Sequence, residues 1–316
     1  MLESDPIFTS HRSATMFDPK LLSGQRILVT GGGTGLGQAM AERFLGLRAD
    51  VAICGRRKSV CDATAEAWRK QFPERRIDTF GVDIRDAAAV DAMVESLWQQ
   101  GGGLTGLVNN AAGNFISPTE SLSPRGFDAI ANIVFHGSFY VTQAVGKRWI
   151  AGAKCGEWQP GQPFRNVVSI VTTWIDNGSP YVVPSAMSKA GIDIMTKSLA
   201  VEWARFGVRL NAVAPGEIPT EGMSKRLNPG EEPGARSKAR NPMGRPGFMS
   251  ELQHLAAFLM APGHCDWLTG QSIVMDGGSA LATGGNFYEL RDWSDDDWRA
   301  ARERIEAQNA KDKSQR

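Results

Sequence analysis

The sequence has few cysteines and no long apolar run. Its cysteines, Cys54, Cys61, Cys155 and Cys265, are scattered, with no C-x-x-C pair and no histidines at metal-ligand spacing. This pattern predicts reduced, mostly buried thiols and no metal site. Because no stretch of about 18 apolar residues is present, we expect no membrane-spanning helix.

The sequence also lacks an excess of charge of either sign. Its 35 basic and 34 acidic residues give a formal net charge of +1, so no overall field favours nucleic acid or an anionic membrane surface. Any anionic ligand would have to be met by local arginines or lysines. The N-terminal segment contains Glu3 and Asp5 and no long apolar core, which argues against a signal or transit peptide. We therefore expect a cytoplasmic protein that does not bind nucleic acid.

A regular alternation of strands and helices is predicted from about residue 25 to residue 282. The 316 residues suffice for one large domain with a sizeable core. This alternation predicts a single α/β domain with a doubly wound, mostly parallel sheet of the Rossmann type, whose ligands bind outside the carboxyl ends of the strands. The predicted strands cover residues 26–30, 51–54, 77–82, 106–108, 166–171, 208–213 and 272–275.

Three segments flank or interrupt the predicted domain. Residues 1–24 form a polar lead-in. Residues 217–247 are charged and contain Gly and Pro without periodicity, which is typical of a lid or of a floppy insertion. In the C-terminal extension, residues 283–316, Ser294 can cap a peripheral helix that reaches about Asn309 and has three aspartates in its first turn.

A glycine-rich turn, residues 31–37, follows the first predicted strand. A helical pattern through Met40, Phe44 and Leu47 comes directly after it. Strand, glycine turn and helix together favour phosphate binding, because a backbone without Cβ atoms can approach a pyrophosphate and a helix start offers free N–H groups. A glycine-rich connector without a ligand is the alternative.

The second predicted strand ends in a basic turn that contains Arg56, Arg57 and Lys58. A dinucleotide site that prefers NAD would carry an acidic residue here, whereas arginine accommodates a 2′-phosphate. The turn therefore favours NADP(H), with a solvated basic surface as the alternative. Amides and small residues at 109–114 end the fourth predicted strand, and they suit a cofactor lying across it, although an ordinary tight turn uses the same residue types.

The stretch from Ser169 to Lys189 is rich in polar groups. Ser185 and Lys189 are four residues apart at the start of a helical run, so both side chains should lie on one helix face and could serve a bound substrate. A helix-start serine and a solvated lysine are the alternative interpretation. His136 lies in another helical pattern, residues 127–149, and stays an open candidate because most lone histidines on such helices are structural.

Together these motifs resemble the short-chain dehydrogenase/reductase family over residues 24–280. The likeness is carried by residues 30–37, residues 109–113, Lys189 and residues 215–216. The usual catalytic groups of that family are a serine after the fifth strand, a tyrosine four residues before the lysine, and that lysine. Here the tyrosine position is Ser185, and Ser169 matches the serine only loosely.

A narrower resemblance, to the NADPH-dependent 2,4-dienoyl-CoA reductases, covers nearly the whole chain. It is carried by residues 110–120, 182–186 and 285–291, and serine at the usual tyrosine position is normal in that branch. The resemblance implies hydride transfer to the far end of a conjugated dienoyl-CoA thioester, followed by protonation of the resulting dienolate. It also implies a part in the breakdown of unsaturated fatty acids and a homotetramer.

The same resemblance implies roles for individual residues. Lys189 would hold the nicotinamide ribose, Arg56 the 2′-phosphate, and Asp83 with Ile84 the adenine. Ser185, Arg85 and Arg226 are expected to contact the acyl-CoA, because guanidinium groups suit phosphate. The full set expected to bind NADP(H) is Gly31, Gly33, Thr34, Gly35, Leu36, Gly37, Arg56, Arg57, Asp83, Ile84, Asn109, Ala111, Gly113, Lys189, Pro215, Gly216 and Ile218.

The residues expected to stabilise the dienolate depart from the family. Mitochondrial-type enzymes place a tyrosine where Trp174 stands and an asparagine where His136 stands, and a peroxisomal type places an aspartate at the position of Val134. We hypothesise that His136 and Trp174 are catalytic residues beside Ser185 and Lys189, with His136 or water as the proton source. An indole N–H donates a hydrogen bond but no proton. Trp174 as a mere wall of the acyl pocket is the alternative.

Two other functions stay open. One is a carbonyl reductase or alcohol dehydrogenase with a different substrate, which the missing tyrosine at Ser185 disfavours. The other is a catalytically silent protein that binds NADPH or acyl-CoA, which the loss of both family donors allows.

Overall fold

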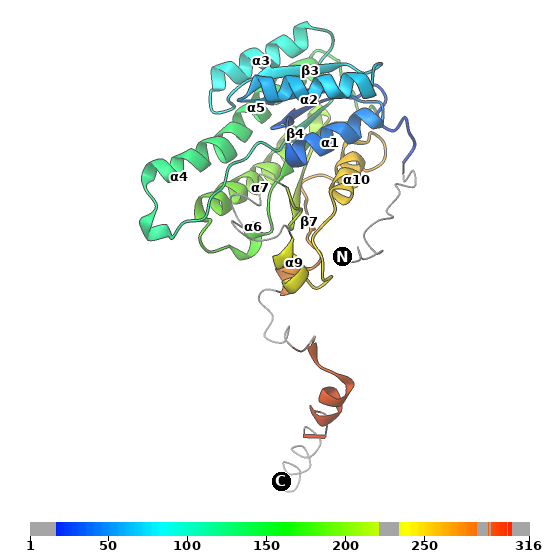
Figure 1. Ribbon diagram of the computed structural model, residues 1–316. Coiled ribbons are helices and arrows are strands. Elements are labelled where there is room, and N and C mark those ends of the chain that lie inside the picture. Colours follow the sequence, from blue (N-terminus) through cyan, green and yellow to red (C-terminus); the bar gives the residue numbers. More distant parts are fainter. Residues whose placement is uncertain (1–16, 221–233, 283–289, 291, 302, 305–316) are drawn as a thin grey trace.

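The computed structural model describes residues 17–220, 234–282, 290, 292–301, 303 and 304 (Figure 1). A seven-stranded sheet with the order β3-β2-β1-β4-β5-β6-β7 forms its centre, and every pair of neighbouring strands is parallel. The predicted doubly wound sheet is thus confirmed. Its strands are β1 (Arg26–Thr30), β2 (Asp50–Gly55), β3 (Ile77–Gly81), β4 (Gly106–Asn109), β5 (Arg165–Ile170), β6 (Val208–Pro215) and β7 (Ser272–Met275).

Helices cover both faces of the sheet (Figure 1). On one face, α1 (Gly35–Gly46), α2 (Lys58–Gln71) and α10 (Met249–Met260) pack into a shared apolar core. On the other face, α3 (Ala87–Gln99), α5 (Gly137–Lys154) and α7 (Val183–Trp203) form a second core. Strands buried on both faces read as continuous apolar runs, which is why composition alone locates them. No helix among the described residues is long and apolar enough to cross a membrane.

The helix predicted at residues 127–149 is longer than expected and is interrupted. Ser123 caps α4 (Pro124–Ala131) by accepting a hydrogen bond from the Gly126 N–H at 3.1 Å. A π-helical turn, η3 (Asn132–His136), separates α4 from α5. Such a turn inserts one extra residue into the helix and shifts the faces that follow, which apolar periodicity does not reveal.

Short elements occupy the connections. They are η2 (Thr119–Ser121), α6 (Trp174–Asn177), η4 (Ala204–Phe206), α9 (Ala235–Arg240) and α11 (Ser279–Ala282). Within the segment expected to form a lid, α9 is joined to the end of β6 by a hydrogen bond of 2.6 Å from the Ser237 hydroxyl to the Glu217 carboxylate. Residues 221–233 of that segment lie outside the described residues, so the lid stays a prediction.

The peripheral helix expected in the C-terminal extension begins where predicted. Residues 295–301, 303 and 304 are helical, and the Ser294 hydroxyl accepts a hydrogen bond from the Asp297 N–H at 3.3 Å. Trp293 and Trp298 pack edge to face with ring centroids 4.8 Å apart. Asn309, the expected helix end, lies outside the described residues.

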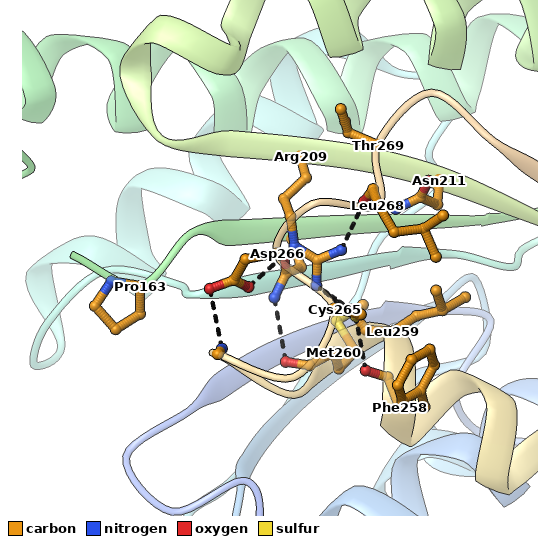
Figure 2. A network of polar contacts seen from close by, with 12 residues as sticks. Pro163, Arg209, Asn211, Phe258, Leu259, Met260, Cys265, Asp266, Leu268 and Thr269 are labelled. Atoms are coloured by element: carbon orange, nitrogen blue, oxygen red, sulfur yellow. Dashed lines mark hydrogen bonds and ion pairs between the residues drawn. The ribbon is translucent and has the colours of Figure 1, made fainter. Parts of the chain in front are cut away.

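A buried arginine of β6 ties the sheet to the segment that follows α10 (Figure 2). Arg209 is 1% exposed. Its guanidinium donates hydrogen bonds to the carbonyl oxygens of Leu259, at 2.7 Å, and Leu268, at 2.9 Å, and its Nε lies 3.5 Å from a carboxylate oxygen of Asp266. Carbonyl groups at a helix end have no partner within the helix, and Arg209 supplies a charged donor to that of Leu259. The Leu268 carbonyl accepts a second hydrogen bond from the Asn211 amide, at 2.8 Å.

We predict that Arg209→Met lowers the free energy of unfolding by about 3 kcal/mol, because buried carbonyls lose charged donors while the side-chain volume is kept. Urea unfolding followed by circular dichroism measures this change. The matched control is Arg125→Met on exposed α4, which should change the free energy by less than about 0.5 kcal/mol. Equal effects of the two substitutions would contradict the role given to Arg209.

Candidate active site

A cavity of about 1080 Å³ lies at the carboxyl ends of β1, β2 and β4. It brings together residues that are far apart in the sequence, as a parallel sheet requires of the segments that follow its strands. Ser185 of α7 also reaches it. Of the residues expected to bind a dinucleotide, those that line the cavity are Gly31, Gly33, Thr34, Gly35, Leu36, Arg56, Arg57, Asp83, Ile84, Ala111 and Gly113.

The floor of the cavity is a contact between the glycine turn and the end of β4. The Asn110 amide donates hydrogen bonds to the carbonyl oxygens of Thr30, at 3.0 Å, and Gly31, at 3.3 Å. A Cβ at Gly37 would lie 2.4 Å from the Asn110 amide nitrogen and 2.5 Å from the Gly31 oxygen. Gly31 itself has φ of +64°, a region that favours glycine. Side chains at these two positions would therefore push the two segments apart.

Two helices begin at the cavity without a side-chain cap. The N-cap residues are Thr34 for α1 and Arg57 for α2, neither side chain makes a capping hydrogen bond, and neither helix has an acidic residue in its first turn. Free N–H groups and the positive end of the helix dipole attract phosphate. Thr220 also lines the cavity, with its methyl group 3.9 Å from where a Gly35 Cβ would lie. This arrangement fits the pyrophosphate of a dinucleotide.

The basic side chains of the turn after β2 differ in whether they are available to a ligand. The Lys58 ammonium lies 2.8 and 2.9 Å from the two carboxylate oxygens of Asp62, and the Thr79 hydroxyl donates to the same carboxylate at 2.6 Å. The hydrogen bond from Lys58 is the main reason that the pKa of Asp62 lies below its usual range. Arg56 and Arg57 are exposed and line the cavity. These two guanidinium groups, rather than Lys58, are thus placed for an anionic ligand.

Asp83 and Arg85 form an ion pair at the cavity edge. The Arg85 guanidinium reaches the Asp83 carboxylate at 2.5 to 3.0 Å, and this contact holds the pKa of Asp83 below its usual range. A second, open cavity of about 510 Å³ is lined by Asp83, Arg85, Asp86 and Asn132. Arg85 is therefore beside a polar groove, as a contact to a charged carrier would need. Arg226, the other arginine expected there, lies outside the described residues.

Ser185 and Lys189 lie on one buried face of α7, as their spacing predicts. Pro184 sits in the first turn of the helix, where its missing N–H costs nothing. Lys189 is 7% exposed and donates a hydrogen bond to the Ile170 carbonyl at the end of β5. Burial lowers the pKa of Lys189 to about 8. Tyr181, by contrast, lies outside the helix, is 60% exposed and has φ of +64°.

Other expected cofactor residues lie beneath or beside the cavity. The buried Asn109 amide donates to the hydroxyls of Thr142, at 2.8 Å, and Ser169, at 3.3 Å, so it joins β4 to α5 and β5 below the cavity floor. Pro215, Gly216 and Ile218 form the end of β6 and the segment after it. Ile218 is buried in the first core, and a Cβ at Gly216 would lie 2.8 Å from the Asp276 backbone.

The structure does not bring His136 and Trp174 into the lining of the cavity. His136 is exposed; its Nδ1 lies 3.4 Å from the Tyr140 hydroxyl, and its ring packs edge to face on Phe135. His136 lies at the end of the π-helical turn, and Ile133 of the same turn lines the cavity. Trp174 is partly buried at the start of α6. The hypothesis that the two act together on a substrate stays a prediction.

Several cavity residues carry no role in the sequence-based expectations, among them Gln38, Val60, Cys61, Ile133 and Thr220. Asn114 was expected there only as a member of the amide-rich run at residues 109–114. Ile133 gave no signal, because its direction depends on the π-helical turn.

Comparison with known proteins supplies independent information. The family model described as enoyl-(acyl carrier protein) reductase matches residues 31–280. An uncharacterized oxidoreductase of Caenorhabditis elegans is 41% identical over 300 residues, which are 93% of this chain and 92% of that protein. A protein of the same organism named probable 2,4-dienoyl-CoA reductase is 40% identical over 296 residues, 92% of each chain.

The fold is also found among solved structures. A gluconate 5-dehydrogenase from Burkholderia cenocepacia, in complex with NADP and tartrate, is similar with a TM-score of 0.74 and 27% sequence identity. The similarity covers 83% of this chain and 98% of that one.

We predict that Lys189 makes stability depend on pH in alkaline solution. Its folded-state pKa of about 8 lies below the ordinary value of 10.5, so the unfolded chain binds more protons between these values and stability rises with pH there. Relative to Lys189→Met, the wild type should gain up to about 3 kcal/mol between about pH 7 and about pH 10. Urea unfolding at several pH values measures both variants. Parallel pH profiles would show that the Lys189 pKa is not lowered.

Proposed function

Because this chain belongs to the short-chain dehydrogenase/reductase family of oxidoreductases, we propose that it is an NADPH-dependent reductase of 2,4-dienoyl-CoA or of a related unsaturated acyl-CoA. One observation carries the choice: Ser185, at the family's tyrosine position, lines the cavity above the buried Lys189. A carbonyl reductase of this family would need the tyrosine. The relative named as a 2,4-dienoyl-CoA reductase supports the same choice.

NADP(H) is the cofactor that the site supports best. The glycine turn and the uncapped start of α1 would hold the pyrophosphate, and Arg56 with Arg57 would hold the 2′-phosphate. Asp83 and Ile84 would frame the adenine, and Lys189 would hold the ribose of the nicotinamide, beside residues 215–218. When bound, the reduced nicotinamide supplies a hydride.

The proposed substrate needs a charge-stabilising site more than a strong acid. Hydride addition at the δ carbon of a conjugated dienoyl thioester moves negative charge to the thioester oxygen, where oriented donors and a nearby positive charge lower the barrier. The Ser185 hydroxyl can donate there, and Lys189 supplies the charge. Arg85, and Arg226 by resemblance, would meet phosphates of the carrier. His136 and Trp174 stay candidates for further donors, although neither lines the cavity.

Loss of NADPH absorbance with a panel of dienoyl-CoA thioesters tests the proposal. Turnover of dienoyl-CoA is the expected result. Turnover of 3-ketoacyl-CoA instead would favour the carbonyl reductase, and NADPH binding in calorimetry without any turnover would favour a silent binding protein. Acyl chain length and the place of the product double bond would come from the same panel.

We predict that Arg56→Gln raises the KM for NADPH by about tenfold or more, because one charged donor to the 2′-phosphate is lost. The KM for NADH, which has no such phosphate, should change little. Lys58→Met is the matched control: its ammonium is already held by Asp62, so its KM for NADPH should stay near that of the wild type. Equal effects of the two substitutions would remove Arg56 from the phosphate site.

A homotetramer and a cytoplasmic location stay predictions. The surface of α7 gives the first some support, because Met187, Ile194 and Val201 are exposed at seven-residue intervals, Val201 by 83%. Exposed apolar rows of this kind often mark contacts between chains.

We predict that Val201→Glu lowers the molecular mass of the assembly measured by sedimentation velocity. An unchanged mass would place the contact between chains elsewhere.

A further inference from the structure

The π-helical turn η3 lies beside two segments that line the cavities. Ile133 of the turn lines the large cavity, and its side chain lies 3.5 Å from where a Gly113 Cβ would lie, in the segment after β4. Asn132, at the start of the turn, lines the second cavity together with Asp83 and Arg85 of the segment after β3. Turns of this kind are frequent at functional sites, so the residues around it are candidates for a role in binding.

Gly137, the residue directly after the turn, allows α5 to approach Ile84 closely. Gly137 is buried. A Cβ at this position would lie 2.6 Å from both Cγ1 and Cδ1 of Ile84 and 3.2 Å from its carbonyl oxygen. Non-bonded carbon atoms attract each other best at about 3.5 to 4.0 Å, so any side chain at residue 137 would overlap with Ile84.

The surroundings of Ile84 leave the cavity as the direction in which it would be displaced. Ile84 is 5% exposed and belongs to the second apolar core, with Val141 and Val145 of α5. A β-branched side chain is restricted in χ1, and a close-packed core does not absorb an added methyl group without a shift. Because Ile84 also lines the large cavity, an overlap with residue 137 would push it toward that open space.

The segment that carries Ile84 is held on both sides of it. The Val82 N–H donates a hydrogen bond to the Gly55 carbonyl oxygen at 3.1 Å. The Asp86 carboxylate caps α3 by accepting hydrogen bonds from two backbone N–H groups, at 2.9 and 3.0 Å. With both ends held, the position of Ile84 depends on the space that Gly137 leaves.

We propose that Gly137 is a positioning residue for the cofactor: by leaving room for Ile84, it keeps the wall of the adenine subsite in place. The inference rests on the proposed function, in which Ile84 frames the adenine. It extends that site to a residue that does not itself line the cavity. Gly137 takes no part in hydride or proton transfer, so its effect is confined to the binding of the cofactor.

Gly137→Ala tests this role through the dissociation constants of NADPH and NADH, measured by fluorescence titration. Adenine is common to the two cofactors, so the added methyl group should raise both constants by the same factor, about tenfold. Arg56→Gln should weaken the binding of NADPH alone. With dienoyl-CoA and saturating NADPH, the kcat of Gly137→Ala should stay near that of the wild type.

Gly146→Ala is the matched control on the same helix. A Cβ at Gly146 would lie 2.5 Å from Cζ3 of Trp203, which belongs to the same apolar core as Ile84. Neither Gly146 nor Trp203 lines the cavity. This substitution should lower the free energy of unfolding and leave both dissociation constants at the wild-type values. An equal rise of these constants in the two alanine variants would show a general packing effect and overturn the proposal.

Ile84→Ala isolates the contact, because it removes the two side-chain atoms that the methyl group would meet. Once residue 84 is alanine, Gly137→Ala should add little to either dissociation constant. If Gly137→Ala alone does not fold, this double variant should fold, because the overlap is gone.

Four results would overturn the proposal: unchanged cofactor binding in Gly137→Ala, an effect on NADPH alone, independent effects of the two substitutions, or a double variant that does not fold. A wild type that binds neither cofactor would refute the proposed function and this inference together. A wild type that binds both cofactors but does not reduce dienoyl-CoA would refute the proposed substrate and leave the role of Gly137 standing.

Discussion

The site depends on how closely the backbone of the glycine turn approaches the end of β4. The absence of Cβ atoms at Gly31 and Gly37 lets the Asn110 amide bind two carbonyl oxygens of the turn. This contact fixes α1 with its uncapped start directed to the cavity, and it fixes the course of residues 110–114 along the same cavity. One constraint thus sets the course of two segments that line the cavity.

Charge in this protein is local. The net charge is close to zero, yet Arg56 and Arg57 line the cavity, and Lys189 lies buried one helical turn after the cavity-lining Ser185. Asp62 holds Lys58, so a specific carboxylate decides which cations of the basic turn face the cavity. Asp83 pairs with Arg85 at the cavity edge. A phosphate would then be recognised by local geometry rather than by an overall field.

The features that could be predicted from the sequence are those marked by apolar periodicity or by a cluster of one residue type. Apolar runs located every strand, and the glycine turn, the basic turn, the amide-rich run at residues 109–114 and Ser185 located more than half of the cavity lining. The π-helical turn was not predicted, because a single inserted residue carries no residue-type signal of its own. The sequence placed His136 in a helix, and its exposed position at the end of this turn was not foreseen. The ion pairs of Lys58 with Asp62 and of Asp83 with Arg85 depend on side-chain rotamers, which a sequence pattern does not determine.

The substitution of the family's tyrosine follows from the chemistry that the cavity supports. A ketone is reduced with proton delivery to its own oxygen, so a phenol beside that oxygen is useful. In a dienoyl thioester the oxygen keeps its carbonyl in the product, and the proton is needed at carbon. Neutral donors that hold charge without giving up a proton serve this reaction better, because protonation on oxygen would have to be reversed. A serine hydroxyl is a donor of this kind, and Ser185 lines the cavity here.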